Sequence, residues 1–426
     1  MHLEGKKLLI LGANPETIPL VETANNMGIK TYVTSNRPDD AAKKFASKAC
    51  NIDGMDVDGL VNLVQQEKID GVLVGVADML VPIYCKVCHR LNLPCYATPE
   101  TCEVFSSKDE FKNICNAFGI KNIPQYSITE EMKDEDVRKI AFPVMVKPVD
   151  GYSGLGMSLC KNEKELRDGI KKALNFSKCK RFIVERYMQC EDIGIYYTFK
   201  NGECFVSCIY DRHTTDEQIG YSRVNLCSTY PSKYANDYFS KVHKNAIKMF
   251  KHLKIQHGVL LISAFYENGE IYMYDPGFRL QGEAPHLLMK SISGFDQSKM
   301  LINFALTGIE GNIDIEDKDV LFNGKKGATL WFLLKKGVIK RIFGLDNITK
   351  DPRVVANVQR LHEGDEIFDD WVGTEKQVLT RLYLVCNDKN ELCNCIDEYL
   401  NKIKVFDTHG NSMLLSGFNT KLIRNT

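Results

Sequence analysis

The chain has 426 residues, and its 55 basic residues (Lys and Arg) balance its 55 acidic residues (Asp and Glu). That length is enough for about three domains with sizeable cores. The balanced charge gives no overall field that would attract nucleic acid or an anionic membrane, and no basic run with interleaved aromatic residues occurs. The apolar run near the N-terminus is too short for a signal peptide or a membrane span. We therefore expect neither nucleic acid nor a membrane as a partner.

The fifteen cysteines are scattered along the chain, which is typical of unpaired thiols in a reducing compartment and predicts a cytoplasmic location. One group, Cys85-Lys-Val-Cys88-His89, fits the pattern of c-type haem attachment. Apolar residues recur at helical spacing around it, and haem attachment of that kind belongs to exported proteins. An ordinary helix is therefore favoured there over a haem or zinc site.

The first hundred residues alternate between strand-like and helix-like segments. Residues 6–12 predict a buried strand, followed by a helix at 18–27 and a strand at 30–35. Residues 61–76 repeat helix then strand, and residues 88–97 add another such unit. This alternation predicts a small doubly wound parallel sheet. The turn after the first strand lacks the glycines of a dinucleotide fingerprint, so no dinucleotide is expected there.

A lysine and a glycine-rich loop follow a short apolar strand at Val144–Val146. Lys147 comes directly after the strand, and the loop then contains Tyr152, Ser153, Gly154 and Gly156. Glycines let backbone N–H groups approach an anion, and the lysine adds a positive charge for phosphate. The order of lysine and glycines differs from that of a P-loop. A glycine-rich hairpin in an ordinary sheet is the alternative interpretation.

Two further polar segments follow. Residues 181–192 predict an apolar strand that leads to Glu185 and ends at the acidic pair Glu191-Asp192, an arrangement that can offer carboxylates to adenine and ribose. Residues 210–225 contain Arg212, His213 and Arg223 in what reads as a polar loop. Such a loop can close on an anionic substrate, and the alternative is a solvated connection. Residues 241–258 predict an amphipathic helix.

The most informative segment is Ile271–His286, which reads as a strand ending in polar side chains. Asp275, Arg279, Gln281 and Glu283 stand at alternating positions, so they share one face for as long as the backbone stays extended. An acid beside an arginine can hold a cation against phosphate and clamp a second anion. A surface ion-pair ladder beside a turn is the alternative.

The last hundred residues predict a third, β-rich piece. Strands are expected within residues 327–345 and 380–387, followed by a helix at 390–402 and a final strand. An acidic stretch at residues 310–319 separates this piece from the preceding segments.

Taken in order, the lysine with its glycine loop, the acidic hinge and the acid–arginine strand resemble the ATP-grasp superfamily, especially its biotin carboxylase and carbamoyl-phosphate-synthase-like branch. The resemblance covers most of the chain. It implies a Rossmann-like, doubly wound domain at residues 1–100 and an ATP-grasp domain of two sheets at 101–312. It further implies a mobile lid at about 127–190 and a small β-rich domain at 313–426. The expected fold class is therefore mixed α/β and α+β.

The resemblance also implies roles for individual residues. Lys147 and Lys108 would contact phosphates, Glu185 the adenine amine, and Met188 the adenine edge through its backbone. The full set expected at the nucleotide is Lys108, Lys147, Tyr152, Ser153, Gly154, Gly156, Glu185, Met188, Glu191 and Asp192.

On the metal hairpin, Asp275 and Ser263 stand at the positions implied to hold one or two Mg²⁺ ions. Gly277 stands where the family has an asparagine, so the chain keeps one carboxylate and one hydroxyl for the metal. Arg279 is implied to hold the acid substrate. Glu283 is the candidate general base, with a salt-bridged rim carboxylate as the alternative. Arg279, Glu283 and Lys147 are thus the expected catalytic residues.

The implied activity is an ADP-forming, ATP-dependent ligase. It would join a small carboxylic acid or amino acid to an amine or another nucleophile through an acyl phosphate, and a homodimer is one expected assembly. Two alternatives stay open: a phosphotransferase on the same fold, and a degenerate ATP-binding regulatory module, which Ser263 and Gly277 motivate. A biotin-dependent carboxylase is not expected, because the chain has no biotinyl-lysine motif such as Met-Lys-Met.

Overall fold

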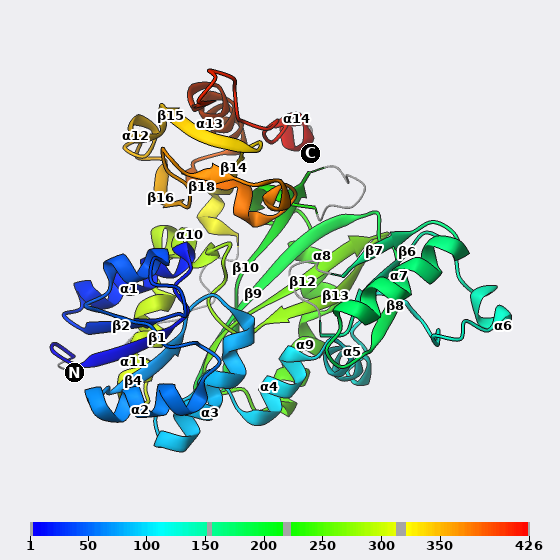
Figure 1. Cartoon of the computed structure of the whole chain (residues 1–426), viewed down its shortest axis with the longest axis horizontal. Coiled ribbons are helices and arrows are strands. Elements are labelled where there is room, and N and C mark those ends of the chain that lie inside the picture. Colours follow the sequence, from blue (N-terminus) through cyan, green and yellow to red (C-terminus); the bar gives the residue numbers. More distant parts are fainter. Residues whose placement is uncertain (1–2, 151–155, 216–222, 312–320, 425–426) are drawn as a thin grey trace.

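The computed structural model describes residues 3–150, 156–215, 223–311 and 321–424. The described strands form two four-stranded sheets, one eight-stranded sheet and one three-stranded sheet. Figure 1 shows the N-terminal sheet on one side of the eight-stranded sheet and a smaller lobe on the other side. The mixed α/β and α+β class predicted from the sequence is confirmed.

The N-terminal sheet is parallel and has the strand order β3-β2-β1-β4. Its elements are β1 (Lys7–Leu11), α1 (Ile18–Asn26), β2 (Lys30–Thr34), β3 (Lys48–Cys50), α2 (Val57–Glu67), β4 (Gly71–Val74) and α3 (Val81–Leu91). Leu8–Leu11 are fully buried, as expected for a parallel strand covered on both faces. The strand predicted near residues 93–97 does not form, and the short strand β3 was not predicted.

A helix from much later in the chain completes this layer. Helix α11 (Gln297–Thr307) packs on β1 and β4. A Cβ atom at Gly71 would lie 2.3 Å from the Ala305 carbonyl oxygen, so only glycine lets α11 approach β4 this closely. The N-terminal sheet and the large sheet are consequently parts of one continuous core.

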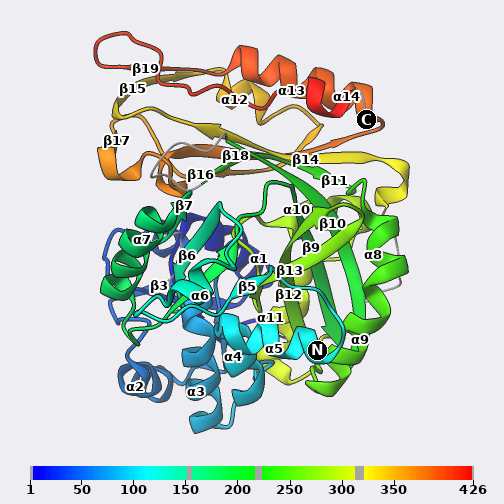
Figure 2. The ribbon, with the colours of Figure 1, turned by 90° about the vertical axis from the view of Figure 1, so that its right-hand side faces the viewer.

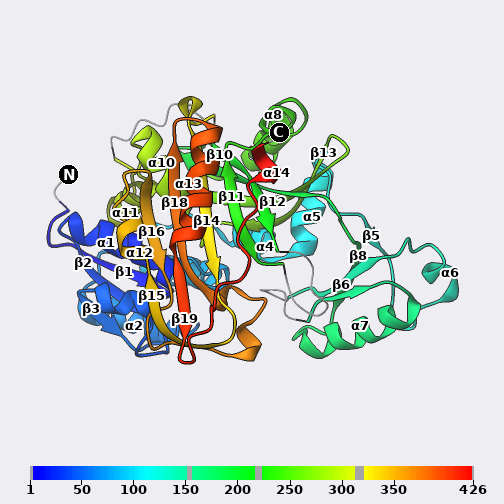
Figure 3. The same ribbon diagram turned by 90° about the horizontal axis from the view of Figure 1, so that it is seen from above.

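The smaller lobe is an antiparallel sheet with the strand order β5-β8-β6-β7. Its elements are β5 (Gln125–Tyr126), α6 (Asp134–Val137), β6 (Val144–Pro148), β7 (Ser158–Cys160), α7 (Glu163–Phe176) and β8 (Phe182–Arg186). Helix α7 starts at Asn162, whose side chain accepts a hydrogen bond from the Glu165 backbone N–H, and it buries Leu166 and Ile170 against the sheet. The lobe has its own hydrophobic core and stands apart from the rest in Figure 3. We call it the lid.

The eight-stranded sheet is antiparallel and has the order β13-β12-β9-β10-β11-β14-β18-β16. Its strands are β9 (Glu191–Lys200), β10 (Glu203–Thr214), β11 (Asn225–Tyr230), β12 (Gly258–Glu267), β13 (Glu270–Gly277), β14 (Lys326–Leu333), β16 (Val354–Gln359) and β18 (Val378–Cys386). The helices around it are α4 (Pro99–Ser106), α5 (Lys108–Ala117), α8 (Ala235–Lys241), α9 (His243–His252) and α10 (Pro285–Ser293). Helix α9 confirms the predicted amphipathic helix, because it buries Ala246, Met249 and Phe250 at helical spacing.

The large sheet differs from the sequence prediction in two respects. Strand β14 pairs with β11, so the sheet runs across the domain boundary expected between residues 312 and 313. Strand β10 continues to Thr214, so Arg212 and His213 lie in a strand and not in the predicted loop. Both residues pair with β11 across the sheet, Arg212 with Ser228 and His213 with Cys227.

The C-terminal layer covers the far end of this sheet (Figure 2). It consists of β15 (Gly337–Phe343), α12 (Leu345–Ile348), β17 (Glu366–Ile367), α13 (Lys389–Lys402), β19 (Lys404–Asp407) and α14 (Lys421–Arg424). Its strands have the order β17-β15-β19. Helix α13 buries Leu392, Ile396 and Tyr399 in a core shared with β18. The predicted helix at 390–402 is therefore confirmed.

Candidate active site

Glu185 on β8 is clamped by two lysines. The side chain of Glu185 is 3% exposed. Its Oε2 lies 2.7 Å from Lys147 Nζ, while its Oε1 pairs with Lys112 of α5. The strand register explains the first contact: Met145 on β6 is paired with Glu185, and Lys147 lies two residues further on the same face. Burial alone would raise the pKa of Glu185, but Lys147 and Lys112 together hold that pKa below its usual value.

Lys108, the first residue of α5, belongs to the same charged group. The Ser107 side chain caps α5 by accepting a hydrogen bond from the Glu110 backbone N–H. Burial lowers the pKa of Lys108, and the positive charge of Lys147 lowers it further. The negative charges of Asp275 and Glu185 act in the opposite direction and raise it. The lid and α5 thus bring three lysines, Lys108, Lys112 and Lys147, close to one buried carboxylate.

Asp275 faces this group from the large sheet. It lies on β13 opposite Ser263 of β12, and its side chain is accessible to solvent. The protein atoms crowded around it raise its pKa, Asp78 adds to the rise, and Lys108 opposes it. The structure therefore brings together Lys108, Lys147 and Asp275 from three separate elements. Asp78, from the short 3-10 helix at Asp78–Leu80, is a neighbour that the sequence analysis missed.

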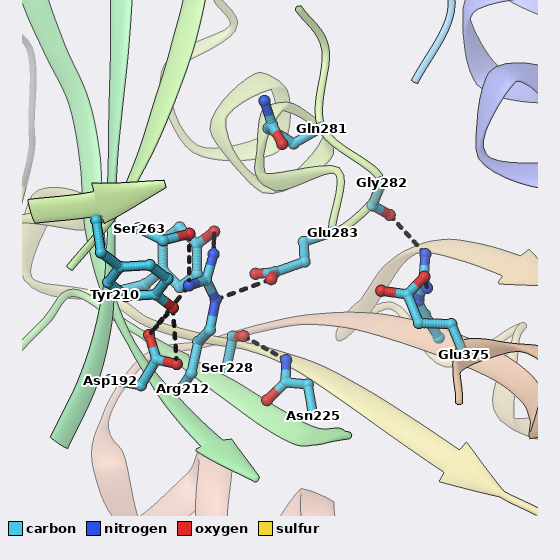
Figure 4. Close-up of polar contacts among 12 residues, drawn as sticks. Asp192, Tyr210, Arg212, Asn225, Ser228, Ser263, Gln281, Gly282, Glu283 and Glu375 are labelled. Carbon is cyan, nitrogen blue, oxygen red and sulfur yellow. Dashed lines mark hydrogen bonds and ion pairs between the residues drawn. The ribbon is translucent and has the colours of Figure 1, made fainter. Parts of the chain in front are cut away.

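A second group of predicted residues is gathered around Arg212 (Figure 4). Arg212 Nη1 donates to Asp192 Oδ1 and to Ser263 Oγ, each at 3.1 Å, and Arg212 Nε lies 2.8 Å from Glu283 Oε1. The Arg212 side chain is only 8% exposed. Burial raises the pKa of Asp192, although Arg212 opposes the rise. Glu283 Oε2 is buried without a hydrogen-bond partner in the described part of the chain.

Arg279 does not lie on one extended face with Asp275 and Glu283, as the alternating pattern predicted. Strand β13 ends at Gly277, so the shared face expected to continue to Glu283 stops there. Arg279 Nη1 donates to the Leu280 carbonyl at 2.9 Å and to Gln281 Oε1 at 2.8 Å, while Nη2 pairs with Asp78. The arginine is therefore buried and tied to its own loop and to the N-terminal domain.

Gly277 is required by this local packing. Gln281 Nε2 donates to the Gly277 carbonyl at 2.7 Å, and a Cβ atom at residue 277 would lie 2.7 Å from the same nitrogen. It would also lie 3.0 Å from an Asp78 carboxylate oxygen. An asparagine at this position would force Gln281 and Asp78 to move, so the glycine and its two neighbours form one arrangement.

Arg381 on β18 supports the loop that carries Arg279 and Glu283. Its Nη1 donates to the Gly282 carbonyl at 2.6 Å and to Glu16 Oε1 at 2.7 Å, and its guanidinium stacks 3.9 Å from the Trp331 ring centre. Glu16 belongs to the N-terminal domain, and Arg381 is fully buried. The loop is thus held in place by Arg381 from the C-terminal part of the chain, and Glu16 from the N-terminal part holds Arg381. Neither Arg381 nor Glu16 could be predicted from the sequence, because no local pattern links them.

The remaining predicted residues fall into three groups. Met188 is buried beside Arg186, and Glu191 pairs with Lys233 at 3.4 Å on the face of β9 opposite to Asp192, since neighbouring strand residues face opposite ways. Gly156 has a φ of +74°, and a Cβ atom there would lie 2.8 Å from Phe176. Tyr152, Ser153 and Gly154 lie outside the described residues.

Comparisons with known proteins bear on the fold of this chain. The family described as D-ala D-ala ligase C-terminus matches residues 115–282. The crystal structure of L-amino acid ligase from Bacillus licheniformis is 16% identical with a TM-score of 0.76, covering 95% of this chain and 99% of that chain. Phosphoribosylglycinamide synthetase from Anaerococcus prevotii is 18% identical with a TM-score of 0.74, covering 95% and 100%. The chain has the ATP-grasp fold.

The curated relatives found by sequence are much longer than this chain. The carbamoyl phosphate synthase large chain of Clostridium perfringens (strain 13 / Type A) is 20% identical over 303 residues, which are 67% of this chain and 28% of that protein. The chain therefore spans about a quarter of the length of the curated relatives it matches. Within the described ranges, no helix combines the length and the apolar character that a membrane crossing requires.

Proposed function

We propose that this protein is an ADP-forming, ATP-dependent ligase that joins a small carboxylic acid or amino acid to an amine through an acyl phosphate. The observation that supports this most directly is the convergence of Lys108 and Lys147 on Asp275 from three elements. Lysines near a solvent-accessible carboxylate can bind phosphates and a divalent cation together. Phosphoryl transfer depends mainly on such positioning and charge stabilisation.

In the nucleotide half of the site, Lys147 and Lys108 would bind phosphates from the lid and from α5. Glu185 keeps Lys147 in place through the 2.7 Å contact, and a carboxylate has enough lone pairs to accept the adenine amine as well. Met188 would contribute its backbone to the adenine edge. Asp192 is the better placed of the two acids for the ribose, because Glu191 points to the opposite face of β9.

The donor set fits one magnesium ion. Asp275 supplies a hard oxygen ligand, and Mg²⁺ commonly fills its remaining positions with waters and substrate phosphates. Ser263 is a poorer second ligand, because its hydroxyl oxygen already accepts from the Arg212 guanidinium at 3.1 Å and a cation beside it repels a metal. When bound, the ion would neutralise charge on the transferred phosphoryl group.

In the acid half of the site, Arg279 and Arg212 provide positive charge next to the phosphates. Arg279 would bind the carboxylate substrate with Nη2 in exchange for its present contact with Asp78, and Arg381 holds the loop that carries it. Glu283 would accept a proton from the attacking amine, since its Oε2 is buried and has no hydrogen-bond partner in the described structure. The substrate carboxylate would attack the γ-phosphate of ATP, which forms the acyl phosphate and releases ADP. The amine would then displace phosphate from the acyl phosphate and give the amide product.

A panel of carboxylic acids and amines, scored for ADP release and followed by mass determination of the product, tests the proposal. We expect ADP release that needs both substrates, and loss of release in Asp275→Asn but not in the matched control Asp369→Asn, whose carboxylate is exposed in the C-terminal layer. Phosphorylated acid that accumulates without an amine would instead identify a phosphotransferase. ATP binding without turnover across the panel would identify a regulatory module.

Two further expectations accompany this proposal. The fifteen cysteines are all unpaired, which supports a cytoplasmic location. Analytical ultracentrifugation of the purified protein tests the expected homodimer.

A further inference from the structure

A group of thiols and one imidazole lies in the N-terminal domain, apart from the residues assigned to ATP and the acid substrate. Cys85 and His89 are one turn apart on α3, and Cys95 comes back to them after the helix ends in the left-handed residue Asn92. One ligand atom from each of these three side chains lies within 4.8 Å of the other two, and the Cys85 sulfur is 3.3 Å from His89 Nδ1. Among the residues that the structure describes, this is the only such group of three His, Cys, Asp or Glu side chains.

These separations suit a tetrahedral zinc ion. Zinc binds thiolate sulfur at about 2.3 Å and imidazole nitrogen at about 2.0–2.1 Å, so ligand atoms around one ion lie roughly 3.5–4 Å apart. The three ligand atoms lie within 4.8 Å of one another, so small side-chain rotations would bring them into that range. His89 Nδ1 also lies 2.8 Å from the Cys85 carbonyl oxygen, a contact that zinc would replace if this nitrogen is the ligand. The i, i+4 spacing of Cys85 and His89 places both on one face of α3, and Cys95 approaches the same face from the following segment.

The surroundings also suit a soft metal. Cys85 and Cys95 are both turned toward the Ala97 carbonyl, at 3.5 Å and 3.1 Å, so their sulfurs converge on one point of the backbone. Thiolate and imidazole together select zinc over the oxygen-binding cations. His89 is exposed, so solvent reaches the group and a water molecule can complete the coordination.

We propose that Cys85, His89 and Cys95 bind one zinc ion that ties the segment after α3 to that helix. This site is separate from the magnesium position proposed at Asp275 and does not depend on the ligase activity.

The proposed zinc site packs, through Tyr96, against the loop after β13 that carries Arg279. Cys95 directly precedes Tyr96, whose ring packs edge-on against Phe278 with 5.1 Å between ring centres. Phe278 is next to Arg279 in sequence. An ion that fixes Cys95 on α3 would therefore also fix Tyr96 against the end of β13.

Zinc binding to the full chain, first treated with a chelator under reducing conditions, tests the proposal. We expect one zinc per chain by native mass spectrometry and calorimetry, and a thiolate-to-metal charge-transfer band when Co²⁺ is added instead. Cys95→Ser and His89→Gln should each weaken zinc binding by more than about tenfold. Cys179→Ser and His409→Gln serve as matched controls, because both residues are exposed and distant in sequence, and they should bind zinc as the wild type does.

His89→Gln keeps the proposal testable if Cys95→Ser fails to fold, since His89 is exposed and Cys95 is half-buried. Zinc should also raise the thermal midpoint of the wild type and leave that of His89→Gln unchanged. Absence of one-to-one binding by the reduced wild type overturns the proposal, and so does zinc affinity that survives both Cys95→Ser and His89→Gln. A disulfide between Cys85 and Cys95 in anaerobically purified protein would overturn it as well.

Discussion

Replacement of Lys147 by alanine separates two roles that the structure gives to one side chain. Lys147 neutralises the buried carboxylate of Glu185 at 2.7 Å, and it is also the proposed phosphate ligand of the lid. Removing one partner of a buried ion pair destabilises a protein by about 3–5 kcal/mol. We expect about 3 kcal/mol for Lys147→Ala, because Lys112 remains paired with the other oxygen of Glu185.

A double variant, compared with Glu185→Gln alone, separates the phosphate role of Lys147 from the proposed adenine contact of Glu185. Lys147→Ala combined with Glu185→Gln removes the buried charge that Lys147 balanced, and Lys112 still donates to Gln125 Oε1 at 3.0 Å. The double variant should therefore recover most of the lost stability. Its affinity for ATP should stay reduced by about 1.5–3 kcal/mol, or roughly tenfold to a hundredfold, since hydrogen bonds to charged groups contribute that much.

Thermal and denaturant unfolding report the stability, and titration calorimetry reports ATP affinity. Lys139→Ala is the matched control, because Lys139 is an exposed lysine of the lid whose ion pair with Asp136 lies at the surface. It should change neither quantity measurably. If the double variant binds ATP as tightly as Glu185→Gln does, Lys147 is only the counterion of Glu185 and its role at phosphate is refuted.

Four further predictions follow from the same geometry. Asp275→Asn should lower magnesium-dependent ADP formation by roughly a hundredfold or more, which a coupled assay measures, and full activity would place the metal elsewhere. Arg279→Lys should raise the KM for the acid with unchanged ATP affinity in steady-state kinetics, because lysine loses the two-pronged fork. Lys147 and Lys112 hold the pKa of Glu185 below its usual value, so the stability that Glu185 contributes is complete above the ordinary glutamate pKa and is lost as the pH falls through the lowered one. Denaturant unfolding should show this acid dependence in the wild type and not in Glu185→Gln. Gly156→Ala should destabilise the lid by about 1–2 kcal/mol in hydrogen exchange, since its φ is positive and Phe176 blocks a Cβ atom; unchanged exchange would contradict that strain.

Local sequence patterns were sufficient for most of the architecture. Leu8–Leu11 form an uninterrupted apolar run, and such a run specifies a doubly covered strand without any knowledge of its neighbours. The pattern failed where a partner strand decides the structure. Arg212 and His213 look like loop residues, yet β11 pairs with both of them and so extends β10 past its apolar part. The expected strand near Cys95 did not form.

The site was predictable only where one short segment carries a whole motif. Lys147, Glu185 and Asp275 each stand in such a segment, so the motifs alone singled them out as candidates. Their partners could not be found in the same way. Arg381 and Glu16 are 365 residues apart in sequence, and Arg279 and Asp78 are 201 apart. Such pairs arise only when separate layers pack, and no local spacing encodes them.

The pairing of β14 with β11 has a practical consequence for dissecting the protein. A fragment ending at residue 311 would keep the lid and the strands β9–β13 but lose β14, β18 and β16. The edge of β11 would then expose a row of unpaired backbone N–H and C=O groups to other chains, a recognised cause of aggregation. Arg381 would also be missing, so Glu16 and the Gly282 carbonyl would lose their shared donor. A minimal working fragment must therefore extend at least through β18, whatever boundary the sequence suggests.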